Sequence, residues 1–179
     1  MAVGVFGGRF DPPHLGHLAL ARAAVEHFRL DALHVTVVAD AAHKESSASA
    51  EHRLGMAQLT FAGLDAAVEL ERHRYTVDAL EAKLYEDPIF LIGGDELAAF
   101  PTWKEPERVL ELARLGVAAR SGWEPPSKSD RIEIFELAPQ PVSSTEIREL
   151  VRRGEPIGGL VAPAVAEYIA EHNLYRDVC

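Results

Sequence analysis

The chain has 179 residues, of which 47% are hydrophobic, and its 18 basic and 28 acidic side chains give a formal net charge of −10. This length suits one ordinary domain, and this hydrophobic content excludes a disordered polyelectrolyte. The sequence has no apolar run near the roughly 20 residues that a membrane-spanning helix needs. The acidic balance argues against binding to nucleic acid or to an anionic membrane.

The single cysteine, Cys179, excludes an intrachain disulfide and a cysteine-based zinc cluster. The first residues of the sequence lack the basic region and apolar stretch of a secretory signal. We therefore expect an unprocessed, cytoplasmic protein.

Short apolar or β-branched runs alternate with helical patterns along the chain. The expected strands are residues 2–7, 33–39, 67–71, 88–92, 115–119 and 132–137. The expected helices are residues 15–28, 51–63, 76–85, 105–113, 144–153 and 163–171. This alternation predicts an α/β fold with a doubly wound, Rossmann-like parallel sheet. We expect one domain over residues 1–179, with the helical part from about 144 to 175 packed on it.

The most informative segment is residues 7–17, Gly-Gly-Arg-Phe-Asp-Pro-Pro-His-Leu-Gly-His, between the first expected strand and the first expected helix. Paired glycines let a ligand approach the backbone, and the first turn of a helix offers free N–H groups at the positive end of its dipole. This combination predicts a phosphate site. His14 and His17 share one face of that turn and can donate hydrogen bonds to phosphate oxygens. A tight turn without a ligand, or a metal site of Asp11, His14 and His17, would also fit.

This segment lacks the ending of a Walker loop and the third glycine of a dinucleotide fingerprint. It closely resembles the GG(S/T)FDPxHxGH signature of the nucleotidyltransferase superfamily, specifically that of the nicotinate mononucleotide adenylyltransferases. Further segments are similar, in order, to the family's PPHK, SYT, IGxD, FxxW and ISSTxIR elements: residues 43–44, 74–76, 91–95, 100–103 and 142–148.

The resemblance implies that the 5′-phosphate of nicotinate mononucleotide attacks the α-phosphorus of ATP, without a covalent enzyme intermediate. It implies these two small-molecule partners and Mg²⁺ bound with ATP, and no metal site made by the protein alone. The implied catalytic residues are His14, His17, Lys44 and Arg148. The implied ATP-binding residues are Gly7, Gly8, Arg9, Phe10, Gly16, Gly93, Asp95, Ser144 and Thr145. The implied acceptor-binding residues are Tyr75, Thr76 and Trp103, with Trp103 stacking on the pyridine ring.

The chain departs from the family pattern at a few positions. Arg9 stands where the family usually has Ser or Thr, Gly94 replaces a commoner Ala, and the prolines usual before His43 are missing. Arg9 therefore places a long cation beside the expected phosphates, or points outward. The missing prolines leave Lys44 less constrained by its own loop.

Alternatives remain open at this point. Trp103 would also fit a core aromatic, Thr76 and Asp95 would fit helix caps, and Trp123 beside two prolines is expected to anchor a loop. A sibling adenylyl- or cytidylyltransferase with another acceptor, or a non-catalytic nucleotide sensor, would share the histidine loop. The sequence also leaves open whether the protein is a homo-oligomer and whether it prefers nicotinate or nicotinamide mononucleotide.

Overall fold

The computed structural model of the chain describes residues 1–39, 47–83, 85–125 and 129–176. Parallel strands form one six-stranded sheet in the order β3-β2-β1-β4-β5-β6. The strands are β1 (Val3–Gly8), β2 (Ala32–Val38), β3 (Ala66–Glu71), β4 (Ile89–Gly93), β5 (Arg114–Ala119) and β6 (Ile132–Glu136). This order and the parallel pairing confirm the predicted doubly wound, Rossmann-like fold.

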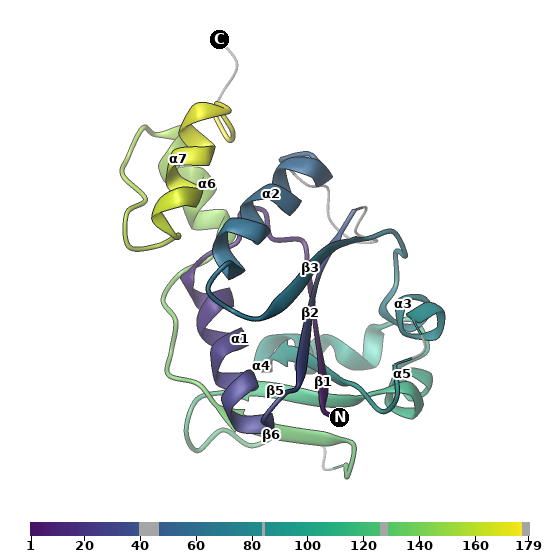
Figure 1. Ribbon diagram of the computed structural model, residues 1–179. Helices are drawn as coiled ribbons and strands as arrows, with labels where there is room; N and C mark the ends of the chain where they lie inside the picture. The colour runs from purple at the N-terminus through teal and green to yellow at the C-terminus, as the bar shows by residue number, and fades with distance from the viewer. Residues whose placement is uncertain (40–46, 84, 126–128, 177–179) are drawn as a thin grey trace.

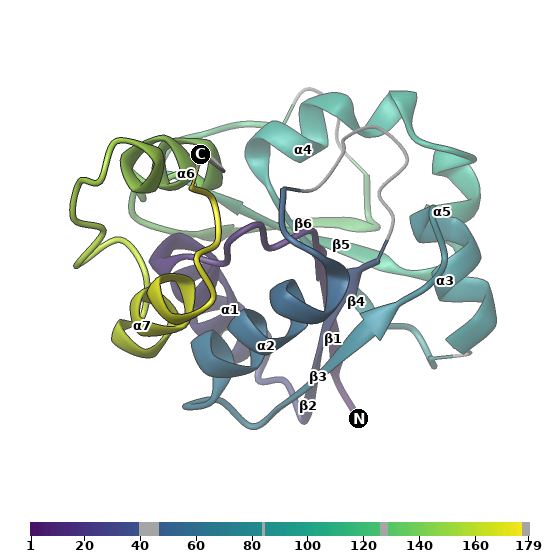
Figure 2. The same ribbon diagram turned by 90° about the horizontal axis from the view of Figure 1, so that it is seen from above.

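Helices cover both faces of the sheet, as Figures 1 and 2 show. They are α1 (Leu15–Phe28), α2 (Ala50–Phe61), α3 (Thr76–Lys83), α4 (Gly94–Ala99), α5 (Pro106–Leu112), α6 (Ser144–Arg152) and α7 (Pro163–Glu171), with a 3₁₀ turn η1 (Phe100–Thr102). The expected helices did not include α4 or η1, because segments this short carry little periodic signal. Only the alternative reading of Asp95 as a cap implied a helix from Glu96, and in the structure the N-cap of α4 is Gly93. None of the described helices is long and apolar enough to cross a bilayer.

Two hydrophobic cores lie on opposite faces of the sheet. Strand β4 contributes to both, because successive side chains of a strand point to opposite faces. Ile89 and Leu91 join the core under α1 and α2, while Phe90 and Ile92 join the core under α3, α4 and α5. A third core joins α2 to α6 and α7, with Met56 packed among residues such as Ile147 and Val165. The C-terminal helices therefore lie against α2, as Figure 1 shows.

The strand order places a topological switch point between β1 and β4. The chain leaves β1 toward β2 and β3, and leaves β4 toward β5 and β6. Connections that diverge in this way open a crevice at the carboxyl ends of the two strands, where ligands of doubly wound proteins bind. The histidine segment and the segment after β4 both begin at this edge.

Candidate active site

The loop from β1 to α1 is sharply bent and well packed. Phe10 has a left-handed backbone, with φ 51°, and the Asp11–Pro12 bond is cis. The Phe10 side chain is only 2% exposed and packs edge-on against Phe6 and Phe61. Burial of this ring offsets the unfavourable torsion, because a non-glycine residue at positive φ is strained. Phe10 thus anchors the loop in the core, and its side chain does not line either cavity described below.

His14 and His17 cap α1 reciprocally. The His17 backbone N–H donates to Nδ1 of His14 at 3.4 Å, and the His14 backbone N–H donates to Nδ1 of His17 at 3.1 Å. The two rings are stacked, with centroids 3.7 Å apart. A Cβ atom at position 16 would lie 3.0 Å from the His14 ring, so Gly16 is the residue that leaves room for this stack.

Both imidazoles are neutral donors near pH 7. Burial lowers the pKa of His14 from 6.5 to about 4. Burial, and secondly the proximity of His14, lower the pKa of His17 well below its ordinary value. Because each Nδ1 accepts a backbone N–H, the single proton of each neutral ring is on Nε2. The pair therefore presents two Nε2–H donors without adding positive charge.

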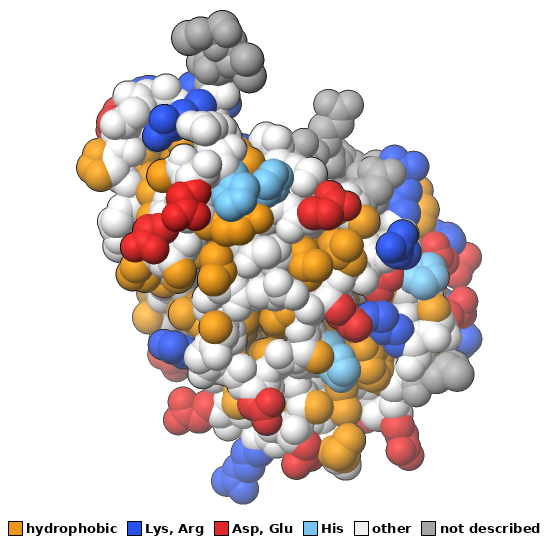
Figure 3. Space-filling model, turned by 45° about the horizontal axis from the view of Figure 1, so that its top comes forward, with side chains coloured by type: hydrophobic (Ala, Val, Ile, Leu, Met, Phe, Trp, Pro, Cys, Tyr) orange, Lys and Arg blue, Asp and Glu red, His pale blue; other side chains and the backbone are white. Residues whose placement is uncertain are grey.

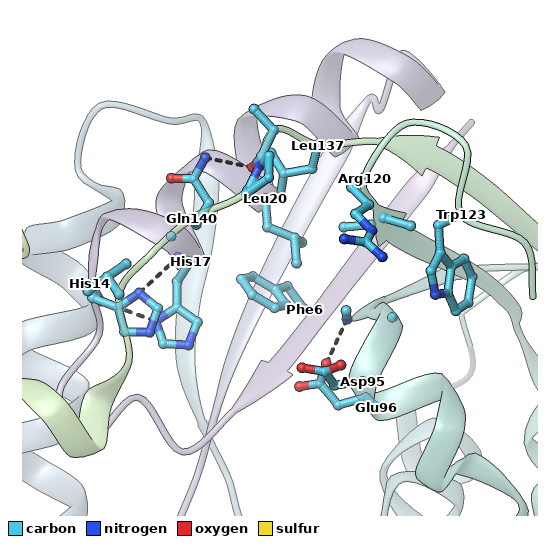
Figure 4. A pocket seen from close by; sticks show the side chains of 18 residues that line it. Phe6, His14, His17, Leu20, Asp95, Glu96, Arg120, Trp123, Leu137 and Gln140 are labelled. Atoms are coloured by element: carbon cyan, nitrogen blue, oxygen red, sulfur yellow. Dashed lines mark hydrogen bonds between the residues drawn. The ribbon is translucent and has the colours of Figure 1, made fainter.

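The larger cavity has a volume of about 550 Å³ and lies between α1, the end of β4 and the ends of β5 and β6. His14 and His17 are at one end of it, and Arg120 and Trp123 are at the other, with Phe6 between them (Figure 4). Asp95 and Glu96 at the start of α4 complete its wall. This size is typical of a small-molecule site. The cavity thus joins a hydrogen-bonding end to an end with an aromatic ring and a cation.

The smaller cavity, of about 210 Å³, lies across the switch point, over the ends of β1, β2 and β3. It brings together Tyr75, Thr76 and Trp103, the three residues predicted to bind the acceptor. The Trp103 ring is held edge-on by Phe90 and Phe100, at centroid distances of 6.1 and 5.3 Å. Trp103 therefore packs on the core and also lines the cavity, and its stacking on a pyridine ring stays a prediction.

A buried carboxylate supports the rim of this smaller cavity. Glu71 is 5% exposed and accepts two hydrogen bonds from His73, at 2.8 Å from the backbone N–H and at 2.7 Å from the ring Nδ1. Lys83 lies 3.4 Å from its other oxygen. Burial alone would raise the pKa of Glu71, but these bonds and the Lys83 charge outweigh it and lower the pKa. Glu71 is therefore ionised at neutral pH and fixes the His73 ring beside Thr76.

The two cavities meet at Glu96, which lines both. Its carboxylate accepts the Gly93 backbone N–H at 2.7 Å and so caps the first turn of α4. A ligand in each cavity would approach the other at this point. The arrangement suits a reaction between two bound molecules.

The predicted ATP-binding residues that line a cavity are divided between the larger and the smaller one. Gly16, Gly93 and Asp95 line the larger cavity beside the histidines. In contrast, Gly7, Gly8 and Arg9 line the smaller cavity, beside the residues predicted to bind the acceptor. The glycine pair and the histidine pair therefore line different cavities. Lys44 and His43 lie outside the described residues, and the role of Lys44 stays a prediction.

Arg148, Ser144 and Thr145 hold the histidine loop from behind. Arg148 donates from Nη1 to the Asp11 carbonyl oxygen at 2.7 Å and from Nη2 to the Thr145 hydroxyl at 3.2 Å. The Ser144 hydroxyl donates to the Pro12 carbonyl oxygen at 2.8 Å. None of these three residues lines either of the two cavities. Arg148 and Ser144 thus contact the loop that carries His14, and Thr145 contacts Arg148. Contact of any of the three with a phosphate stays a prediction.

Sequence reasoning missed Arg120, Trp123 and Glu96. Arg120 directly follows β5, so the rule that ligands bind at the carboxyl ends of parallel strands would have found it. Trp123 was expected only to anchor its loop, but it packs on the core and also lines the larger cavity. Glu96 belongs to α4, a helix too short to be predicted, so no signal pointed to it.

The metal alternative finds no support in the geometry. The Asp11 carboxylate accepts backbone N–H groups of Ser47 and Ala48 and the Tyr175 hydroxyl, so it turns away from the histidines. No group of three His, Cys, Asp or Glu side chains suited to a metal ion occurs within the described parts of the chain.

On the face shown in Figure 3, acidic and basic side chains are interspersed. The formal net charge of −10 is therefore not concentrated in one patch on this face.

Comparison with known proteins gives the same family as the motifs. The family model described as cytidylyltransferase-like matches residues 5–150. A Chlorobaculum parvum protein named "Probable nicotinate-nucleotide adenylyltransferase" is 37% identical, over 99% of this chain and 100% of its own length. An Albidiferax ferrireducens protein of the same name is 40% identical, over 97% of this chain and 98% of its own.

Among solved structures, the Plasmodium falciparum nicotinic acid mononucleotide adenylyltransferase complexed with NaAD superposes with a TM-score of 0.78. It shares 19% identity, and the match covers 97% of each chain. This likeness confirms the fold, while the 37–40% identity of the full-length relatives shows the family. The chain belongs to the nicotinate-nucleotide adenylyltransferases of the cytidylyltransferase-like family.

Proposed function

We propose that this protein transfers the adenylyl group of ATP to nicotinate mononucleotide and releases pyrophosphate. The observation that carries the proposal is the pair of cavities that meet at Glu96, one with the histidine donors and the other with the aromatic and hydroxyl side chains. A reaction between two nucleotides needs two adjoining sites, and orientation of the reactants supplies much of the catalysis. The full-length relatives, which are named for this activity, support the same choice of substrates.

In the proposed reaction, an oxygen of the acceptor's 5′-phosphate attacks the α-phosphorus of ATP. The new bond joins the acceptor to the adenylyl group, the bond from the α-phosphorus to the bridging oxygen breaks, and that oxygen leaves with pyrophosphate. The attacking oxygen is already anionic, so no side chain has to remove a proton. The task left to the protein is positioning and the stabilisation of charge on the phosphate oxygens.

We assign ATP to the larger cavity. The Nε2–H groups of His14 and His17 would bind the phosphates, and the positive end of the α1 dipole would add to the attraction, because neutral donors at a helix N-terminus stabilise oxyanions. At the far end, Trp123 and Arg120 are the groups suited to the adenine ring, by stacking and by cation–π contact. Asp95 would accept hydrogen bonds from ribose hydroxyls.

Magnesium enters as part of the substrate, MgATP, and neutralises charge on the triphosphate. A magnesium ion of this kind needs only one or two protein carboxylates beside phosphate oxygens and water. Glu96 fits that need, because it lies where the two cavities meet, while Asp95 is assigned to the ribose. Lys44 is the further cation that the family resemblance adds on the phosphate side.

We assign nicotinate mononucleotide to the smaller cavity. Trp103 offers a flat apolar surface to the pyridine ring, and Thr76 begins α3, whose first turn offers backbone donors to an anion. Arg9 lies in the same cavity, at the end of β1, on the side from which the acceptor's phosphate would enter. Arg9 stands where the family usually has a Ser or Thr hydroxyl, so a hydrogen-bond donor is kept beside the nicotinate mononucleotide.

Pyrophosphate release tests the proposal directly. The purified protein is incubated with MgATP and one of three acceptors: nicotinate mononucleotide, nicotinamide mononucleotide or pantetheine phosphate. We expect the fastest turnover with nicotinate mononucleotide and none without an acceptor. Turnover only with pantetheine phosphate would reassign the enzyme to a sibling activity. Binding of ATP without turnover of any acceptor would instead identify a nucleotide sensor.

The role of the histidines is tested with His17→Gln. Glutamine at this third helical position can still accept the N-cap N–H, so the cap survives while the Nε2–H donor is lost. Removal of one such donor costs on the order of 10²–10³ in kcat. His27→Gln, at the other end of the same helix and outside both cavities, is the matched control and should keep the wild-type rate. Equal rates for the two variants would remove His17 from the mechanism.

A further inference from the structure

The loop that carries His14 is clamped by segments that lie far apart in the sequence. Besides Arg148 and Ser144, the buried guanidinium of Arg53 donates to the Arg9 carbonyl oxygen at 2.8 Å. The Leu15 backbone N–H donates to the Leu160 carbonyl oxygen at 2.9 Å. These contacts come from α2, α6 and the segment before α7. The C-terminal part of the chain therefore takes part in shaping the histidine loop.

Asp11 is the centre of this clamp. Its side chain is among the most buried polar groups of the described residues, at 2% exposed. One carboxylate oxygen accepts the Ser47 N–H at 2.6 Å, and the other accepts the Ala48 N–H at 3.1 Å and the Tyr175 hydroxyl at 2.8 Å. A buried charge must be hydrogen-bonded on every side to be tolerated, so each of these donors matters.

Tyr175 reaches Asp11 across 164 positions of sequence. It follows α7, and its backbone is left-handed, with φ 61°. Burial raises the pKa of Tyr175, and the Asp11 carboxylate raises it further, so the hydroxyl stays protonated and donates. Tyr175 lines neither cavity, and its hydroxyl donates to Asp11, so the direct route from this hydroxyl to the histidine loop is through Asp11.

We propose that Tyr175 is a positioning residue for adenylyl transfer, because its hydroxyl, through Asp11, fixes the loop that aims the His14 and His17 donors. The proposal rests on the transfer function given above. Only Pro12 and Pro13 separate Asp11 from His14. Proline fixes its φ, so this connection has little torsional slack and passes a displacement of Asp11 on to the N-cap of α1.

A small displacement is enough to matter. The two rings are held by hydrogen bonds of 3.1 and 3.4 Å to backbone N–H groups of the first turn of α1, and the longer of these is already weak. A shift of the N-cap by a fraction of an ångström would release one ring from its Nδ1 contact. Misplacement of reacting groups by about 1 Å costs on the order of 10²-fold in rate. We expect a smaller shift here, and a loss of about tenfold in kcat.

The test is Tyr175→Phe, which removes only the hydroxyl, with Tyr168→Phe as the matched control. Tyr168 lies in the same C-terminal layer, and its hydroxyl is 3.1 Å from Nδ1 of His52, away from the loop. Both variants lose one tyrosine hydrogen bond and both should lower the melting temperature. Only Tyr175→Phe should lower kcat about tenfold, which is about 1.4 kcal/mol of activation free energy, with the KM for ATP changed less than twofold. Equal kcat values in the two variants would overturn the proposal.

A second readout does not depend on turnover. Nitrogen-15 NMR of the imidazoles reports which ring nitrogen carries the proton. In the wild type, His14 and His17 should show the Nε2–H tautomer, because each Nδ1 accepts a backbone N–H. Tyr175→Phe should shift at least one ring toward exchange between tautomers, and Tyr168→Phe should not. Unchanged histidine spectra in Tyr175→Phe would also overturn the proposal.

Asp11→Asn probes the same contact from the other side, should Tyr175→Phe not fold. It keeps the size of the side chain and one acceptor oxygen. If the hydroxyl acts through Asp11, the losses in kcat from the two single variants will not add in the double variant. Additive losses would refute the coupling. If the wild type is inactive but His14 and His17 show the Nε2–H tautomer, the proposed transfer function is refuted. The NMR comparison of Tyr175→Phe with Tyr168→Phe then decides whether Tyr175 positions the histidines.

Discussion

The neutral state of His14 has a measurable effect on stability. The perturbation is His14→Asn, because asparagine is a good N-cap and keeps an acceptor for the helix N–H while removing the titrating ring. Burial lowers the pKa of His14 from 6.5 to about 4 in the folded protein. Between these two values the unfolded chain binds a proton at this position and the folded chain does not. Stability therefore rises with pH across this window and is lost as pH falls through it.

The magnitude follows from the two pKa values. With 6.5 in the unfolded chain and about 4 in the folded one, the loss at pH 5 relative to pH 7 is about 2 kcal/mol. Below pH 4 the loss is complete, at about 3 kcal/mol. Other acid-sensitive groups, such as Glu71, titrate in both proteins. The difference between wild type and His14→Asn therefore reports mainly on His14, with a smaller part from His17, whose pKa the proximity of His14 also lowers.

The assay is urea unfolding of both proteins at pH 7 and pH 5, followed by tryptophan fluorescence. The wild type should lose about 2 kcal/mol more than His14→Asn between the two pH values. The slope of the free energy against urea should agree between the proteins, which shows that both unfold from the same compact state. Equal losses in the two proteins would mean that His14 is protonated as easily in the folded chain as in the unfolded one. The argument for a neutral donor pair would then fail.

The remaining predictions concern the two cavities and the buried arginine. Trp103→Leu should raise the KM for nicotinate mononucleotide about fivefold and leave the KM for ATP unchanged, since loss of a stacked ring costs about 1 kcal/mol. Arg120→Gln should raise the KM for ATP and leave the KM for nicotinate mononucleotide unchanged. Initial rates with each substrate varied in turn measure both constants, and equal effects on the two KM values would contradict the assignment of the cavities. Arg53→Met should cost about 3 kcal/mol or more in urea unfolding, because the Ala48, Arg9, Val38 and Ala39 carbonyl oxygens lose their donor. Arg53→Lys should recover only part of this, as one ammonium cannot reach all four oxygens; full recovery would show that charge alone matters.

The sheet could be predicted because its inner strands are largely buried on both faces. Runs such as residues 33–38 and 115–119 are nearly continuous in apolar or small residues, as a central parallel strand requires. Every predicted strand and helix is present, with ends displaced by one or two residues. Helix α4 escaped prediction because its stability comes from local capping, by the Glu96 carboxylate on the Gly93 N–H, and not from a periodic apolar face.

The candidate site could be predicted only where a motif places a residue at the carboxyl edge of the sheet. His14, His17 and Asp95 lie in the larger cavity, and Thr76 and Trp103 in the smaller one, as their positions after strands indicated. Sequence order could not show that Gly7 and Gly8 line the smaller cavity and not the larger one with the histidines. That depends on which way the chain turns at Phe10, whose left-handed torsion has no signal in the letters.

The signature around His14 combines residues that line the cavity with residues that are buried behind it, and a sequence motif does not distinguish the two. His14 and His17 line the cavity, while Asp11 faces the opposite way, into a buried hydrogen-bonding centre. In a sequence, a carboxylate three residues from a histidine suggests a ligand or a metal site, because burial is invisible there. In the structure, Asp11 and the prolines after it form a rigid link between the C-terminal layer and the donors. Asp11 therefore orders the loop of His14 and His17 without adding negative charge to the cavity that these histidines line.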